Sequence, residues 1–447
     1  MRQVFVHALS LAASLVFACV AAGGDATPPR VPAGALAWWR YDPTAFPAPP
    51  DGAPGAERGL LLASLRAALA SGSLGNRTGA MLGALLLVGL EAGDRPHTLA
   101  LLELSASRPP SGTGVDLHEL RIALRVDSAE RHADMLRTVR AVAIDAFSPP
   151  AGKGGAAPDP GMQARFPLPQ GRTGVAFRRA DWEPWREISW CSEADAFTIG
   201  IGRGTLPAWF QPPPPDAAPT PWEGFRHAID AARPAAPIVF ECFIDIDALR
   251  AHFPDAFLTG RTPRMLAALD LGGAAALLFQ ARAVPATLPD GRLLPLMAID
   301  VAVLNRTGEL EVRSLSHHDW PASVSPAVVP PGTTSATVAT VDWQAAFARV
   351  LAMHAATIPN RKLPRFQARA DAWLAENGRE LDAALAEFAP ALVVWTHPRI
   401  PAPLPGVGCI SIRARDEVPP GRVPARLLRV LAPFEPGVRA DLPTKKA

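Results

Sequence analysis

Three stretches of the chain alternate between apolar and polar residues and lead to an aspartate at the start of a helix-like segment. The stretches and their aspartates are 35–41 with Asp42, 238–246 with Asp247, and 336–341 with Asp342. Alternation with a period of two is typical of a half-buried strand. A carboxylate at the start of a helix accepts hydrogen bonds from the unpaired N–H groups of the first turn. We therefore predict that Asp42, Asp247 and Asp342 are helix N-caps.

After each aspartate the pattern becomes helical and then returns to strand-like alternation. The predicted helices are 58–70, 77–86, 129–147, 248–252, 263–269, 343–357, 361–387 and one near 422–431; the predicted strands between them are 98–106, 117–126, 275–283, 296–305, 310–316, 391–397 and 409–413. Short turns between strands favour antiparallel pairing. The pattern predicts an α+β fold with antiparallel sheets, helices packed on one face, and about three degenerate repeat units.

Proline-rich breaks suggest where one unit ends and the next begins. They lie at 148–160, 211–221 and 323–334, where proline removes backbone donors and stiffens the chain. The predicted organisation is a signal peptide at 1–22, a first α+β unit at 31–147, a central β-rich segment with a second α+β unit at 161–322, a third α+β unit at 335–433, and a loose tail at 434–447.

The N-terminus has the layout of a secretory signal peptide. Arg2 precedes an apolar run over 4–20, and small residues follow at 21–24. Cleavage after Ala22 would release the chain, whereas the segment Val16–Cys19 resembles a bacterial lipobox whose cysteine would be acylated. An uncleaved anchor is a third alternative. No later segment has the ~18 to 20 continuous apolar residues that span a bilayer. We expect an exported chain that is periplasmic or envelope-associated, with a lipid anchor at Cys19 as one alternative.

Composition limits the classes of function. Of 447 residues, 49% are hydrophobic, which excludes a chain too polar to fold. The 44 basic and 42 acidic residues give a net charge of +2, whereas phosphate binding needs a concentrated basic surface. We therefore expect no nucleic-acid partner and a neutral scaffold without a concentrated ionic site.

Three cysteines lie in strand-like stretches beyond the leader: Cys191, Cys242 and Cys409. One interpretation is that they are buried small hydrophobic residues, and the other is one disulfide with an unpaired thiol. None belongs to a Cys-x-x-Cys pair, so their spacing does not predict a metal site.

Other groups of polar residues are candidate sites for metal binding, catalysis or cofactor binding. His317, His318 and Asp319 are candidate metal ligands, although neighbouring residues rarely point at one centre. Glu241, Asp245 and Asp247 alternate along one strand and could flank a substrate, or could simply be its polar face. The glycines of 200–204 lack the frame of a dinucleotide fingerprint. We therefore predict no cofactor and no metal, and the catalytic residues are unknown.

The third unit contains several short sequence motifs that carry a resemblance to known proteins, and further motifs of this kind occur earlier in the chain. They are 341–343, 377–385, 391–395, 403–408 and 415–416, together with 31–36, 253–257 and 269–272. In these motifs the chain resembles a family of exported bacterial proteins of unknown function that is common in planctomycete-like genomes. The resemblance implies export and this order of elements, and it implies no reaction and no site residues.

No nucleophile elbow and no metalloprotease motif occurs in the sequence. We therefore expect a non-enzymatic, envelope-associated binding or interaction protein. The alternative is a metal-independent hydrolase acting on an envelope polymer or a small ester, because catalytic triads assemble from residues far apart in sequence.

Overall fold

The computed structural model describes residues 31–32, 34–45, 95–107, 116–128, 132–147, 163–178, 186–212, 220–233, 235–252, 261–358, 360–396 and 409–414. The signal peptide, Cys19, the helices expected at 58–70, 77–86 and 422–431, and the tail at 434–447 lie outside these ranges. Among the residues that are described, no helix is both long enough and apolar enough to cross a bilayer.

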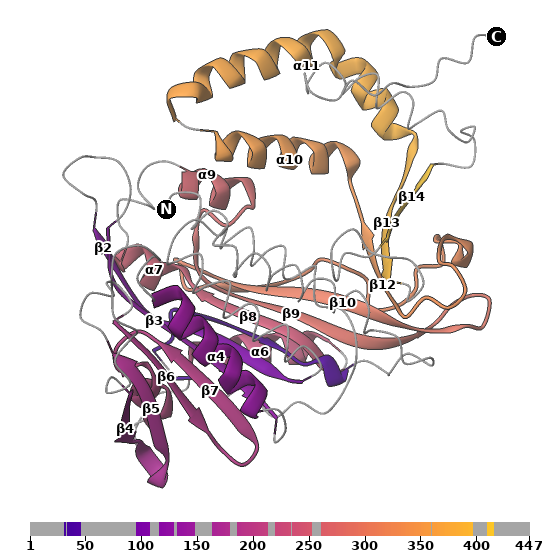
Figure 1. Ribbon diagram of the computed structural model, residues 1–447. Helices are drawn as coiled ribbons and strands as arrows, with labels where there is room; N and C mark the ends of the chain where they lie inside the picture. The colour runs from indigo at the N-terminus through magenta and orange to yellow at the C-terminus, as the bar shows by residue number, and fades with distance from the viewer. Residues whose placement is uncertain are drawn as a thin grey trace.

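A single sheet of 14 strands organises the molecule (Figure 1). Its strands are β1 Ala37–Tyr41, β2 His97–Ser107, β3 Asp116–Asp127, β4 Gln163–Pro167, β5 Thr173–Arg178, β6 Glu187–Ser192, β7 Ala196–Ile201, β8 Ile238–Asp245, β9 Ala274–Thr287, β10 Leu293–Asn305, β11 Leu310–Ser314, β12 Ser335–Thr340, β13 Phe388–Thr396 and β14 Cys409–Ala414. They lie in the order β14-β13-β12-β10-β9-β8-β1-β2-β3-β7-β6-β5-β4, with β11 beside β10. Every pair is antiparallel except β10 and β12.

Seven α-helices accompany the sheet in the described ranges, so the fold is α+β. They are α4 His132–Phe147, α5 Thr205–Phe210, α6 Pro221–Ala232, α7 Ile246–His252, α9 Arg261–Ala268, α10 Trp343–Thr357 and α11 Leu363–Ala386. Short 3-10 turns occur at η1 Pro43–Ala45, η3 Pro169–Gly171, η4 Pro326–Val328 and η5 Asn360–Lys362. One sheet therefore runs through all three of the predicted units.

The helices do not all cover one face, contrary to the prediction. On β3, Leu124 packs in a cluster with Met135 of α4, whereas the neighbouring Ala123 packs in a cluster with Phe225 of α6. Successive residues of a strand point to opposite faces. Hence α4 and α6 lie on opposite sides of the sheet, because both faces of its central strands are apolar enough to need cover.

The proline-rich segment 323–334, predicted as a break between two units, contributes to the core. Val324 and Val329 are buried, at 4% and 1% exposure, in a cluster that also holds Trp320. The indole N–H of Trp320 donates to the carbonyl of Val324 at 2.8 Å. Proline here shapes a packed loop between β11 and β12.

The helices α10 and α11 form a hairpin that stands away from the sheet (Figure 1). We call the segment Trp343–Ala386 the arm. Two aromatic pairs join α10 to α11, Phe347 with Trp373 and His354 with Phe366, at centroid distances of 6.5 and 5.2 Å, and Trp343 at the base of the arm packs on Phe388 of β13 at 5.3 Å. Together they hold α11 against α10 from its base to its turn.

Candidate functional site

A line of polar side chains crosses nine strands on one face of the sheet. Its members are direct cross-strand partners, from β11 to β6: Ser314, Asp300, Gln280, Glu241, Arg40, Thr98, Arg125, Thr198 and Cys191. Direct partners share a face of the sheet. We call this line the polar row. Asp300, Gln280 and Thr198 are completely buried.

The helix α6 runs over this face and supplies partners for the row. Trp222, Phe225 and Ile229 of α6 pack on an apolar cluster that includes Trp38 of β1 and Phe243 of β8, each two residues from a member of the row. The helical repeat then directs Arg226 and Asp230 toward the row itself.

Glu241 is the best-compensated carboxylate of the row. It is 2% exposed, and Nε of Arg226 donates to its Oε1 at 2.6 Å while Nη2 of Arg226 binds its other oxygen. The amide of Gln280 also donates to Oε1, at 2.6 Å. On the far side of Gln280, Arg282 donates to the amide oxygen at 2.8 Å and pairs with Asp230. Every charge in this stretch has a partner.

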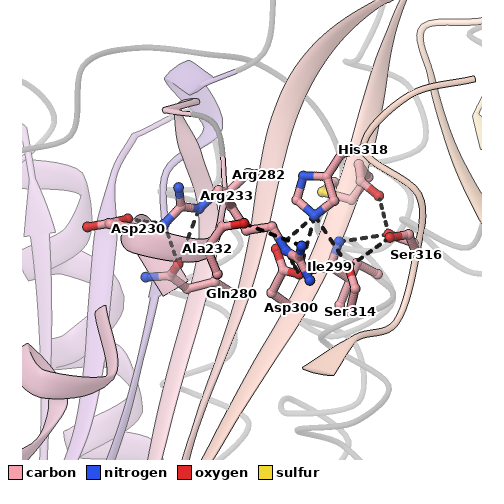
Figure 2. A network of polar contacts seen from close by, with 11 residues as sticks. Asp230, Ala232, Arg233, Gln280, Arg282, Ile299, Asp300, Ser314, Ser316 and His318 are labelled. Carbon is pink, nitrogen blue, oxygen red and sulfur yellow. Dashed lines mark hydrogen bonds and ion pairs between the residues drawn. The ribbon is translucent and has the colours of Figure 1, made fainter. Parts of the chain in front are cut away.

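Asp300 lies next to Ser314, the outer end of the row, as Figure 2 shows. Nε of Arg233 donates to its Oδ1 at 2.9 Å, the hydroxyl of Ser314 donates to the same oxygen at 2.8 Å, and Nε2 of His318 lies 3.1 Å from Oδ2. The carboxylate itself is fully buried. A buried carboxylate requires such compensation, because removal from water disfavours its charged form.

The other half of the row is balanced in the same way. Arg125 donates to Asp127 at 2.8 Å and to Glu193 at 2.6 Å, and Arg172 donates to Glu193 at 2.6 Å. Burial alone would lower the pKa of Arg125, but hydrogen bonds and charge from Asp127 and Glu193 raise it. Burial lowers the pKa of Arg40, which pairs with Asp42 at 3.3 Å.

Six arginines and six carboxylates meet along the polar row. The arginines are Arg40, Arg125, Arg172, Arg226, Arg233 and Arg282; the carboxylates are Asp42, Asp127, Glu193, Asp230, Glu241 and Asp300. A catalytic pair is recognised by groups whose environments push their pKa values apart in a cleft. Mutual neutralisation across a buried sheet face instead indicates a structural role.

Ser314, His318 and Asp300 are the grouping nearest to a catalytic triad. A triad uses both ring nitrogens of histidine, one for the carboxylate and one for the hydroxyl. Here Nε2 of His318 faces both Asp300 and, at 3.4 Å, the Ser314 oxygen. Nδ1 of His318 makes no hydrogen bond within the described ranges. The Ser314 hydroxyl lies closest to Asp300 and also lies 3.1 Å from the carbonyl of Ser316, so one nitrogen of His318 serves both neighbours and the relay through the ring that a triad uses is not formed.

The candidate metal ligands His317, His318 and Asp319 diverge. Nε2 of His317 lies 2.7 Å from the hydroxyl of Thr340 on β12, whereas His318 faces Asp300 on β10. Asp319 is exposed. No group of three or more His, Cys, Asp or Glu residues suited to a metal occurs among the residues that are placed. The three side chains therefore do not form a common centre.

The predicted N-caps have three different outcomes. Asp342 accepts hydrogen bonds from the N–H groups of Gln344 and Ala345, both at 3.0 Å, and begins α10. Asp42 accepts the N–H of Thr44 at 3.0 Å and begins only the 3-10 turn η1.

The prediction for Asp247 was wrong. The helix α7 begins at Ile246, so Asp247 lies inside its first turn. Asp245 takes the capping role and accepts the N–H of Ala248 at 2.8 Å. Asp247 pairs with Arg250 and Arg306 at the surface. The three alternating carboxylates thus separate, since Glu241 is buried in the polar row and does not face the other two across a substrate site.

The glycines after β7 serve a tight turn. Gly202 has φ +98°, and a Cβ atom there would lie 1.9 Å from the carbonyl oxygen of Leu120. The short helix α5 begins directly after these glycines, at Thr205. The Thr205 hydroxyl lies 2.7 Å from the carbonyl oxygens of both Ile201 and Gly202. Close backbone packing explains the glycine at 202.

Two of the cysteines are free, buried thiols. Burial, followed by the nearby charge of Glu193, raises the pKa of Cys191 to about 11, and burial with the charge of Glu241 raises that of Cys242 to about 12. Cys191 and Cys242 are therefore not paired with each other. The side chain of Cys409 lies outside the description. Thiols with raised pKa are poor nucleophiles.

The arm carries the concentrated charge that the overall composition conceals. Residues 343–370 contain five basic residues and no acidic one. Arg349, Arg361, Lys362, Arg365 and Arg369 are all exposed. The net charge of +2 predicts no concentrated ionic site, and that prediction is wrong because acidic residues elsewhere in the chain balance the total. The sequence does contain a local signal for this charged site, because 28 consecutive residues lack Asp and Glu.

The far end of the arm is fixed to α9. The guanidinium of Arg264 donates to the carbonyls of Ala355 and Ile358, at 3.2 and 2.9 Å, and to the side chain of Asn360 at 2.9 Å. A cation at a helix C-terminus complements the negative end of the helix dipole. The turn of the arm is thereby held at a defined place beside α9 (Figure 1).

Known proteins supply no further assignment. No protein-family model matches the chain, and comparison with curated proteins and with solved structures found no match. The resemblance to a family of exported bacterial proteins therefore stays a prediction.

Proposed function

We propose that the chain is an exported, envelope-associated binding protein without enzymatic activity, and that the arm makes its contact. The observation that carries the proposal is the exposure of α10. This helix of 15 residues is apolar around most of its circumference, yet Ala356 is its only fully buried residue. Val350 in its middle is 63% exposed. A helix that is apolar on all sides is normally buried, so this one is suited to a partner.

The distribution of ionisable groups supports binding over catalysis. The polar row neutralises its charges internally, and His318 presents the same nitrogen to Ser314 and to Asp300, which is not the arrangement of a triad. The alternative, a metal-independent hydrolase, would use Ser314, because this hydroxyl is at the exposed end of the row. Turnover of small esters that is lost in Ser314→Ala and kept in Ser325→Ala would favour the hydrolase over the binding protein.

Export rests on the sequence. The apolar run over 4–20 and the small residues after it support a cleaved leader, with acylation of Cys19 and an uncleaved anchor as alternatives. Mass spectrometry of the mature N-terminus separates the three. A chain that starts at Gly23 indicates release, a diacylglyceryl group on Cys19 indicates a lipoprotein, and an intact Met1 indicates an anchor.

We also propose that three segments are degenerate repeats of one unit. The order of elements supports this: β1, β8 and β12 each precede a helical segment and then two neighbouring antiparallel strands. Asp42, Asp245 and Asp342 stand at the junction from strand to helix in each.

Retention on isolated cell envelopes tests the binding role. The full chain should sediment with envelope fragments, and Val350→Glu should weaken this at least tenfold, because a charge interrupts the apolar contact. Leu293→Glu is the matched control, since Leu293 is 80% exposed on the β9–β10 hairpin and lies outside the arm. A chain that stays in the supernatant, or equal loss in both variants, would contradict the proposal.

A further inference from the structure

The strongest charged surface of the described chain lies where the arm turns. Arg361 and Lys362 are in η5, and Arg365 and Arg369 are one turn apart on α11, so these last two share a helix face. All four side chains are exposed, and none forms an ion pair or hydrogen bond with another of the described residues. We call these four residues the basic turn.

The charges of the basic turn are not explained by the stability of the arm. The N-terminus of a helix is the positive end of its dipole, so a cation in the first turn is unfavourable, and Arg365 lies in the first turn of α11. The acidic residues of α11 all lie C-terminal to the basic turn, at Asp371, Glu376, Glu380 and Asp382. The arrangement is unfavourable for the isolated helix on both counts, and it therefore points to an anionic partner.

Apolar side chains lie among the basic ones. Leu363 and Phe366 are partly buried between the charged positions, and Phe366 packs on His354 at 5.2 Å. Arg264 holds this end of the arm against α9, so the surface is presented in a fixed orientation. Basic residues with apolar neighbours suit an interface where charged headgroups cover an apolar layer.

We infer that the basic turn docks on an anionic phospholipid surface. This inference rests on the proposed function and names the partner of its arm. Charge complementarity carries it: each Lys or Arg near an anionic leaflet contributes about 1 kcal/mol. Four such residues raise partitioning roughly 10³-fold over a neutral surface, and the attraction falls as salt screens it.

A lipid surface accounts for more of the chain than another polyanion does. In the two alternatives that keep the N-terminus at the membrane, an acylated Cys19 and an uncleaved anchor, stable anchoring takes two signals, for which a polybasic patch serves as the second. The parts of Leu363 and Phe366 that the arm leaves exposed lie at the same surface, where phosphate groups alone would give them no apolar contact.

Vesicle sedimentation of the full chain tests the inference. The probes are phosphatidylcholine vesicles and vesicles with about a third phosphatidylglycerol, a fraction chosen to give a strongly negative surface. Binding to the anionic vesicles should exceed binding to the neutral ones at least tenfold. The triple variant Arg361→Gln, Lys362→Gln, Arg365→Gln should lower it by about 100-fold, the equivalent of three lost charges. Binding contributed by the shared N-terminus cancels in this comparison.

Arg379→Gln is the matched control, because Arg379 is exposed on the same helix but within its acidic half. It should bind anionic vesicles as the unmodified chain does. Thermal unfolding of the triple variant should be unchanged or slightly higher, so that loss of binding does not reflect misfolding. Equal binding to both vesicles, or a triple variant that binds normally, would overturn the inference.

The result separates the two proposals. A chain retained on cell envelopes but indifferent to phosphatidylglycerol supports the binding role and overturns the lipid partner, and a soluble phosphate polymer that competes for the basic turn would then identify the polyanion. A chain retained on neither contradicts both.

Discussion

Arg226 of α6 and Glu241 of β8 form a two-contact ion pair across the buried face of the sheet, with Nε 2.6 Å from Oε1. We expect Arg226→Met to lower the free energy of unfolding by about 3 to 5 kcal/mol, because Glu241 would remain buried and charged with only Gln280 as a partner. Urea unfolding at pH 7 measures the change.

The control for this prediction is an arginine pair at the surface. Arg313 contacts Glu311 and Asp270 at 2.7 and 3.2 Å, and all three side chains are at least a third exposed. Such pairs contribute about 0 to 1 kcal/mol, so Arg313→Met should change stability little. If the two variants lose similar stability, the polar row does not hold the sheet as described.

The cap of α10 should be separable from the rest of the fold. Asp342→Ala removes two hydrogen bonds to the first turn and should cost about 1 kcal/mol. Asp342→Asn should recover most of that loss, since asparagine is a comparable cap. Asp319→Ala is the control, because this exposed carboxylate makes no contact within the described chain. Hydrogen exchange of the first turn of α10 would localise the effect, and uniform loss across the arm would contradict it.

The sequence pattern predicted the helices and strands better than it predicted which side chains pair with one another. Asp342 follows a strand directly, so its role could be predicted, whereas α7 begins two residues earlier than expected and Asp245 takes the place of Asp247. Periodicity does not encode the register between distant strands. The contact of Arg233 with Asp300 spans 67 positions, and only the fold brings the two together.

The distribution of charge also shows which features a sequence pattern predicts and which it does not. The basic turn could have been found from the acid-free stretch 343–370, because charge segregation is a local property that a total of +2 averages away. The exposure of α10 could not have been predicted, since this helix is apolar enough to be taken for a core helix. Whether such a helix is covered depends on tertiary packing, which no windowed pattern contains.

Arg264 should set the order of the arm's far end. Arg264→Ala removes its hydrogen bonds to the carbonyls of Ala355 and Ile358 together with a favourable charge at the end of α10. We expect amide exchange in the last turn of α10 to rise about tenfold, while global stability changes by less than about 1 kcal/mol. Arg261→Ala on the same helix should leave exchange unaltered. An unchanged last turn in Arg264→Ala would show that α9 does not anchor the arm.

The buried thiols predict how stability depends on pH. In the folded chain burial, reinforced by Glu241, raises the pKa of Cys242 to about 12, whereas an exposed thiol ionises near 8.5 to 9. Above pH 9 the unfolded chain therefore loses a proton that the folded chain keeps. The free energy of unfolding should fall as pH rises from about 9 toward 12, by up to about 1.4 kcal/mol per pH unit for this thiol.

Cys242→Ala isolates that contribution. The variant should be less stable than the unmodified chain at pH 7, because a buried side chain is shortened, but its stability should fall less steeply above pH 9. The difference between the two chains should shrink by about 2 kcal/mol between pH 8 and pH 10.5 in urea unfolding. Cys191→Ala should flatten the curve in the same sense, up to about pH 11. Parallel curves for all three chains would mean that the thiols ionise equally in the folded and unfolded states, which is incompatible with their burial in the sheet.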